Sequence, residues 1–297
     1  MVTPITRGQW EAVRTSLREA GDRFAEMVSS AREPHAKATR DWTVVESAAH
    51  VASITRWYSH MLRFDDGPHP FPTLEGALLA TTVDTVSDVN DVALELFPER
   101  DPRTLAHLLR TYIGEILRVT EGLDPARPVV WLGDSRVPLA GVLAHLVNEL
   151  LVHGWDIASA TRTRWVMPPR EAALFFDLFL VGMIQQDVGR LLDTGEPALD
   201  RRIAVQFHSR YTTPVTLVLR GGRVSSEAPG RDTDVHLYFD PAALNLLLFG
   251  RIGRTRAVAT GKLAVWGRRP WLLPAFLRTV RLPTNARPRS TQEPAGA

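Results

Sequence analysis

The chain has 297 residues, which is enough for one large domain or two ordinary ones, and two is the better expectation. Its composition, with 44% apolar and 23% charged residues, is typical of a soluble globular protein. The formal net charge is +2, and Lys37 and Lys262 are the only lysines, a skew that fits the codon usage of GC-rich bacteria such as actinobacteria. Because the arginines are scattered among 33 acidic residues, nucleic-acid binding is not expected.

The chain contains no cysteine, which excludes disulfides, zinc–thiolate sites and a thiol nucleophile of its own. The first residues, MVTPITRGQWEAVR, contain no apolar segment of signal-peptide length. The most apolar stretch, ALFFDLFLVGMI, is too short to span a membrane and contains Asp177. We therefore expect a cytoplasmic protein with no membrane partner.

Helical periodicity dominates the first two thirds of the chain. The second segment begins with Thr43 and Glu46 at the spacing of a capping box, and the fourth follows the start signal Asp101-Pro102. PVVWLGDSRVPLAG, with Gly133 at its turn, predicts a short hairpin. The predicted helices cover about 6–31, 44–63, 76–97, 102–122, 138–162 and 168–193.

From about residue 200 the pattern changes to period two, which predicts a small antiparallel sheet. Two more helices are expected, in DPAALNLLLFGRI and PWLLPAFLRTV, with a strand-like segment AVATGKLAVWG between them. The predicted fold class is α+β with two domains, a helical bundle over 1–196 and an α+β domain over 197–283. The tail, residues 284–297, is expected to be disordered.

The segment NELLVHGWDIASATR, residues 148–162, places charged groups in an otherwise apolar helix. At 100° per residue, His145, Glu149, His153 and Asp156 fall on one side of this helix. Glutamate and histidine at helical spacing hold metals in helical bundles when a facing helix adds a ligand. The best facing candidate is His50, which lies among small residues.

The spacing alone leaves other interpretations open. Glu149 and His153 are also compatible with a surface ion pair, and His50 with a core histidine whose hydrogen bonds are satisfied. His145 is interpreted as a packing residue or a neighbour of the ligands. Asp156 either orients His153, since metal-bound imidazoles usually donate their other N–H to an acceptor, or is a surface charge.

As a whole, DWTV, then AAHV with His50, then NELLVHGWDIASA resembles the mycothiol-dependent maleylpyruvate isomerase family, a branch of the DinB-like metal-binding four-helix bundles. The resemblance implies a divalent metal, usually zinc, held by His50, Glu149 and His153, and it does not make His145 a ligand. It also implies a low-molecular-weight thiol cosubstrate, mycothiol or a similar compound.

The C-terminal part, TDVHLYFDPAALNLLLFGRIGRTRAVATGKLAVWG, resembles the sterol-carrier-like domain that this family appends to the bundle. The resemblance implies that Arg251, in LLLFGR, assists catalysis. The alternative is that Arg251 is a solvated residue at a helix end. Trp57, Tyr58 and Trp155 are candidates for the pocket of an apolar or aromatic electrophile, with plain packing as the alternative.

Three protein ligands leave one position open on zinc, which is typical of a catalytic site. Because the protein has no thiol, the sulfur nucleophile must come from a cosubstrate. The sequence therefore predicts a metal-dependent thiol S-transferase acting on a small electrophile, as a monomer or homodimer. A thiol-dependent cis–trans isomerase of the maleylpyruvate type, a non-catalytic binder of small hydrophobic ligands and a hydrolase using zinc-bound water stay open as alternatives.

Overall fold

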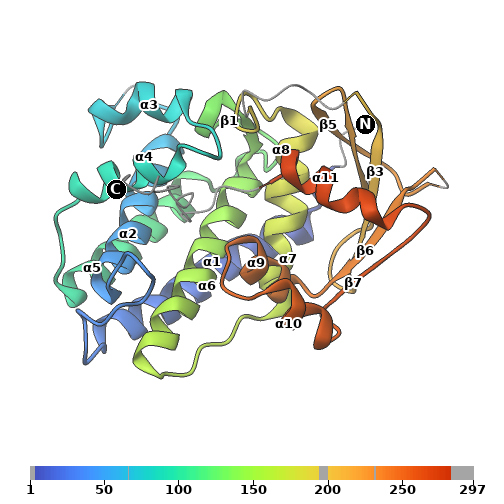
Figure 1. Cartoon of the computed structure of the whole chain (residues 1–297). Coiled ribbons are helices and arrows are strands. Elements are labelled where there is room, and N and C mark those ends of the chain that lie inside the picture. The colour runs from blue at the N-terminus through green and yellow to red at the C-terminus, as the bar shows by residue number, and fades with distance from the viewer. Residues whose placement is uncertain (1–3, 66, 194–199, 231, 282–297) are drawn as a thin grey trace, which may run out of the picture.

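The computed structural model describes residues 4–65, 67–193, 200–230 and 232–281. Long helices pack side by side in one half of the molecule, and a five-stranded sheet with short helices forms the other half (Figure 1). This arrangement confirms the predicted fold class, a helical N-terminal part followed by a sheet domain. The predicted boundary between residues 196 and 197 and the predicted tail over 284–297 lie outside the described residues.

The helical half contains most of the helices, and most of the predicted ones are confirmed. The predicted capping box is present, since Thr43 Oγ1 accepts a hydrogen bond from the Glu46 backbone and Glu46 Oε2 accepts one from the Thr43 backbone. The helices are α1 (Arg7–Ser29), α2 (Val44–Met61), α3 (Glu75–Ala80), α4 (Val86–Glu95), α5 (Pro102–Val119), α6 (Leu139–Thr161), α7 (Pro169–Leu174) and α8 (Val181–Gln186).

Two of the predicted helices have different bounds. The segment predicted as one helix over 76–97 is broken between α3 and α4, because the backbone N–H of Val83 donates to Leu191 and leaves the helical ladder. The helix predicted over 168–193 ends at Gln186, because Asp187 is extended and forms a bridge with Arg136. Both breaks arise from contacts between segments distant in sequence.

The predicted hairpin is formed by β1 (Pro128–Val130) and β2 (Arg136–Pro138). Gly133 lies in its turn with φ at +66°, where a side chain would be strained. A Cβ there would also lie 2.5 Å from the carbonyl oxygen of Thr81. The turn therefore needs glycine for its conformation and for close packing.

The large sheet has the strand order β5-β4-β3-β6-β7. Its strands are β3 (Ile203–His208), β4 (Val215–Arg220), β5 (Arg223–Glu227), β6 (Val235–Phe239) and β7 (Leu263–Trp266). All neighbours are antiparallel except β3 and β6, so the prediction of a wholly antiparallel sheet is wrong at this pair. The β4–β5 hairpin covers one edge of β3, and the chain must cross over to pair β6 with the other edge.

Short helices complete the C-terminal part. They are α9 (Pro241–Leu248), α10 (Arg254–Ala259) and α11 (Leu273–Thr279). The segment predicted as strand-like, AVATGKLAVWG, begins in α10 and becomes extended only at β7. One face of the sheet packs Phe207 and Leu237 against Phe276 of α11 and against Phe176 of the helical half.

Helix α6 is the central element of the helical half, and nearly all its side chains are buried. It contacts α1, α2 and α7, and a helix that is buried on every side must find partners for each polar group that it carries. The close packing is visible at Gly154, where a Cβ would lie 2.2 Å from the indole ring of Trp165. The Trp165 indole N–H donates to the carbonyl of Leu151 on the same helix.

A π-helical segment, Phe175–Leu180, lies between α7 and α8. Phe175 and Phe179 belong to the core of the helical half, whereas Phe176 belongs to the core of the sheet domain. Between them, burial raises the pKa of Asp177 to about 7, against a smaller opposing effect of a backbone hydrogen bond from Thr213. This segment connects the two cores.

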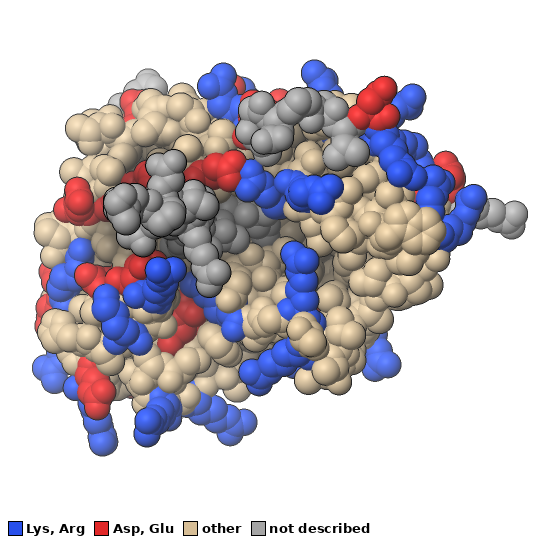
Figure 2. All heavy atoms as spheres, in the orientation of Figure 1, with Lys and Arg blue, Asp and Glu red and all other residues tan. Residues whose placement is uncertain are grey.

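Among the described residues, no helix combines the length and apolarity needed to cross a bilayer. On the face shown in Figure 2, Lys and Arg side chains are spread over the surface and interspersed with Asp and Glu. This distribution agrees with the scatter of charges along the sequence.

We predict that Gly154→Ala lowers the free energy of unfolding by about 2 kcal/mol, because the added methyl must displace a rigid indole ring. Thermal and urea denaturation measure the loss. Gly114→Ala, on α5 with no atom near the added Cβ, is the control and should stabilise the protein by about 0.5–1 kcal/mol. Equal stability of Gly154→Ala and the native chain would contradict the packing described here.

We predict that Asp177→Asn stabilises the protein above pH 7 and not near pH 4. The folded-state pKa lies above the usual carboxyl value of about 3.9, so the native chain loses stability as pH rises between these values. The expected gain at pH 8 is about 2 kcal/mol, measured as a difference in denaturation free energy across pH. Asp193→Asn, at an exposed position, provides the baseline for removing one charge. A gain that does not change with pH would contradict the assignment.

Candidate metal centre

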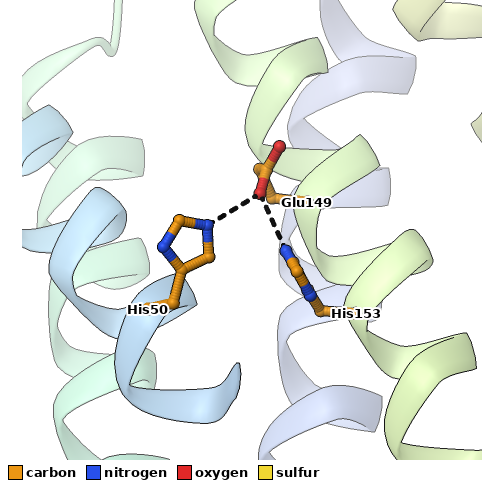
Figure 3. Close-up of side chains that lie close together, drawn as sticks. All are labelled: His50, Glu149 and His153. Carbon is orange, nitrogen blue, oxygen red and sulfur yellow. Dashed lines mark ion pairs between the residues drawn. The ribbon is translucent and has the colours of Figure 1, made fainter. Parts of the chain in front are cut away.

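Two helices bring three potential metal ligands together. Helix α2 supplies His50, and α6 supplies Glu149 and His153 from consecutive turns. One ligand atom of each residue lies within 4.8 Å of the others, and all three residues are buried. Figure 3 shows both imidazoles pointing at the same carboxylate. The structure thus places together the three residues that the family resemblance implies.

The distances match a shared cation better than a set of hydrogen bonds. The Nε2 atoms of His50 and His153 lie 3.5 and 3.4 Å from Glu149 Oε2. A well-formed hydrogen bond between these atoms would measure roughly 2.7–3.0 Å. Ligand bonds of about 2.0–2.1 Å at tetrahedral angles separate neighbouring donor atoms by roughly 3.4 Å. The donor set therefore fits a divalent ion.

The protonation states of Glu149 and His50 also suit a cation. Burial acts to raise the pKa of Glu149, but the close approach of His153 and His50 to its carboxylate outweighs burial and lowers this pKa well below its usual range. Burial lowers the pKa of His50, which keeps the imidazole neutral and its lone pair available. Burial opposes a charge on His153 too, yet Asp156 and Glu149 together raise its pKa. A buried carboxylate between two imidazoles is a common zinc ligand set.

Asp156 connects this cluster to the sheet domain. Its Oδ2 atom lies 3.2 Å from His153 Nδ1. Arg251, just beyond α9, donates from Nε to Asp156 Oδ1 at 3.0 Å and from Nη2 to Oδ2 at 2.6 Å. Because the side chains of Asp156 and Arg251 are only 4% and 16% exposed, the surface-charge and solvated-end interpretations are wrong.

A second chain of contacts reaches Glu149 from the opposite side. The Trp131 indole N–H donates to the Tyr58 hydroxyl at 2.7 Å, and this hydroxyl lies 3.0 Å from His145 Nδ1. Burial raises the pKa of Tyr58 well above its usual value, so its hydroxyl keeps its proton and can donate to His145. When Tyr58 donates to Nδ1 of His145, the imidazole carries its own proton on Nε2. This Nε2 atom lies 3.5 Å from Glu149 Oε1. His145 thus faces the carboxylate oxygen that the other two histidines do not.

A cavity of about 100 Å³ opens beside the three candidate ligands. Trp57 and Tyr58, both predicted pocket residues, line it, and so does Arg251. Trp155 is not among the lining residues, because it lies six positions after Glu149 and therefore on a different side of the helix. Trp155 therefore has no place in the wall of this cavity.

Residues 11–158 match the family model described as the mycothiol maleylpyruvate isomerase N-terminal domain. The chain belongs to this family. Its matched segment begins within α1 and ends within α6, so it contains all three candidate ligands. No curated protein matches the chain significantly.

Three solved structures are similar to parts of the chain. A crystal structure of the mycothiol-dependent maleylpyruvate isomerase is 13% identical, with a TM-score of 0.49, and covers 82% of this chain and 90% of its own. A histidine-to-alanine mutant of that enzyme is also 13% identical, with a TM-score of 0.49 and coverages of 86% and 92%. Sterol carrier protein 2 from Yarrowia lipolytica, in its apo form, is 23% identical over 24% of this chain and 64% of its own, with a TM-score of 0.19.

The sequence analysis missed several residues around the centre. The ring of Trp42 lies 4.5 Å from that of His50 and 6.0 Å from that of His153, centroid to centroid. Its place directly before the capping residue of α2 was the available signal. Trp131 gave no such signal, because its contact with Tyr58 joins segments 73 residues apart.

We predict that the purified protein binds about one divalent ion per chain and that His50→Ala abolishes this binding. The lost imidazole removes one of three ligands, and the remaining two do not hold zinc tightly. Elemental analysis and a zinc titration followed by thermal melting measure the effect. His107→Ala, at an exposed position of α5, is the control and should bind the ion normally. A protein without any affinity for divalent ions would refute the metal centre.

Proposed function

We propose that this protein is a metal-dependent enzyme that uses a low-molecular-weight thiol, mycothiol or a close analogue, to attack a small electrophile. The observation that carries the proposal is the buried cluster of His50, Glu149 and His153 beside a cavity, in a chain of the mycothiol maleylpyruvate isomerase family. The ion that we favour is zinc. These three residues would hold it.

When bound, such an ion supplies an open coordination position and lowers the pKa of a coordinating thiol toward neutrality. The chain contributes no sulfur, since it has no cysteine. Its own residues exclude water from the three candidate ligands and fix the orientation of their side chains. Trp42 covers the two histidines, and Asp156 holds the orientation of His153 through Nδ1.

Arg251 is the chain's candidate for contact with the electrophile. Two of its nitrogens are bound to Asp156 and the third donates to the carbonyl oxygen of Phe249. Three of its five N–H groups are therefore used, which leaves two for an oxygen atom of a bound substrate. Such donors stabilise negative charge that develops on a carbonyl or nitro oxygen during attack.

We favour an S-transferase, in which a carbon–sulfur bond forms and a leaving group departs or the adduct persists. The second candidate is a cis–trans isomerase, favoured by the name of the family. In that reaction the sulfur adds to a carbon of a double bond, the resulting single bond rotates, and elimination releases the thiol unchanged. Only the stoichiometry of the thiol separates the two reactions.

We predict that the metal-loaded protein converts electrophiles only when a thiol is present. Mycothiol, other small thiols and a panel of electrophiles are incubated with it and analysed by mass spectrometry. An S-conjugate identifies the transferase, and an isomer without sulfur identifies the isomerase. His50→Ala should lose at least about 100-fold in rate, whereas His107→Ala should not. Turnover without thiol would indicate a hydrolase, and ligand binding without turnover a carrier.

A further inference from the structure

We propose that the electrophile is uncharged and apolar, and that small dicarboxylates are poor ligands of the cavity. This inference rests on the proposed thiol-dependent function and adds the class of its second substrate. It is drawn from the chemistry of the cavity wall, the pairing of its polar groups and the charge state of its one arginine.

The wall of the cavity beside the metal centre is mainly apolar. It combines side chains from α2, α3, α4, α6 and the π segment with others from the turn between β1 and β2 and from the residues after α9. A wall of this kind desolvates a bound molecule without offering it hydrogen bonds. Its apolar members are Ile54, Trp57, Phe71, Leu74, Leu78, Val86, Val89, Ala93, Trp131, Leu132, Val152, Phe175, Phe179 and Phe249.

Both hydroxyl groups that line the cavity have partners within the protein. The Ser53 hydroxyl donates to the His50 carbonyl. The Tyr58 hydroxyl lies between the indole N–H of Trp131 and the ring of His145. The hydroxyl groups of Ser53 and Tyr58 are thus already hydrogen-bonded within the protein. They are poorly placed to solvate the carboxylate of a bound molecule.

Arg251 is the only lysine or arginine among the described residues that line the cavity. Its guanidinium forms a two-point ion pair with Asp156, which neutralises its charge. A substrate carboxylate would have to compete with this buried carboxylate or remain without a counter-ion. The two free N–H groups of Arg251 suit a neutral carbonyl or nitro oxygen better than an anion.

The metal centre, like Arg251, offers no unbalanced positive charge to a substrate carboxylate. A divalent cation held by the carboxylate of Glu149 and matched by one thiolate has no net charge left for another anion. The cavity therefore provides a favourable environment for an aromatic or aliphatic body with a polarised reactive carbon. The cavity provides no counter-ion for either carboxylate of a dicarboxylate.

Equilibrium binding of a matched pair of probes tests the inference. Methyl 3,5-dinitrobenzoate and 3,5-dinitrobenzoate differ in the negative charge and in one methyl group, and nitroaromatic rings quench the fluorescence of nearby tryptophans such as Trp57 and Trp131. The protein carrying its metal and saturated with mycothiol should bind the ester at least about tenfold more tightly than the acid. Binding of the acid as tight as that of the ester, or no binding of either probe, would overturn the proposal.

Two variants locate the effect. Asp156→Asn removes the counter-ion of Arg251 and should raise the affinity for the acid about tenfold relative to that for the ester. Ala93→Trp fills the cavity from α4 and should weaken ester binding by a similar factor, whereas Val92→Trp, on the exposed side of the same helix, should not. An acid affinity unchanged in Asp156→Asn, or equal ester binding by the two tryptophan variants, would contradict the proposal.

A reactive pair separates this proposal from the function on which it rests. With methyl 4-chloro-3,5-dinitrobenzoate, the thiolate sulfur bonds to the ring carbon that bears chlorine, and chloride leaves with the electrons of the carbon–chlorine bond. A larger rate enhancement over the uncatalysed thiol reaction for this ester than for the corresponding carboxylate supports both proposals. Turnover that favours the carboxylate overturns the substrate class alone. Preferential binding of the unreactive ester without thiol-dependent turnover supports the substrate class and refutes the S-transferase.

Discussion

The ionised carboxylate of Glu149 is the group on which the arrangement of the helical half depends. A charge inside a protein is costly unless it has partners, and α6 offers it no solvent. The imidazoles of His50 and His153 approach one of its oxygens, and that of His145 approaches the other. The placement of α2 against α6 is thus constrained by charge as well as by packing, because a shift of α2 along α6 would take His50 away from this carboxylate.

The sheet domain is coupled to the same carboxylate through two intermediates. Arg251 pairs with Asp156, and Asp156 faces the outer nitrogen of His153. The position of the C-terminal part therefore influences the orientation of a ligand held by the helical half. This coupling explains why a domain with its own core contributes a residue to the wall of the cavity in the other domain.

Much of this structure was accessible from the sequence where the causes are local. Thr43 and Glu46 mark the start of α2 through contacts three residues apart, and the spacing of Glu149 and His153 fixes a shared helix face. The facing position of His50 followed from the family resemblance, with the small residues around it as support. The break at Val83 and the bridge between Arg136 and Asp187 were not predictable, because each depends on a segment remote in sequence.

The same limit applies to the surroundings of the site. The family resemblance indicated Arg251, but its pairing with Asp156 joins residues 95 positions apart, and no local pattern encodes it. The chain of Trp131, Tyr58 and His145 likewise depends on how the hairpin packs against α2 and α6. Side chains in one helix can be assigned to a face from their spacing. Their partners across the molecule require the tertiary structure.

The π segment, Phe175–Leu180, joins the two hydrophobic cores of the protein. The backbone N–H of Val181 reaches back five residues to the carbonyl of Phe176, so this turn contains one residue more than an α-helical turn. Within this segment the neighbours Phe175 and Phe176 enter different cores, whereas Phe179 shares the core of Phe175. Removing a single residue here would restore the regular pitch and rotate one aromatic ring out of its core. The register of this one turn therefore affects both the shape of the cavity, which Phe175 and Phe179 line, and the packing of the sheet domain against Phe176.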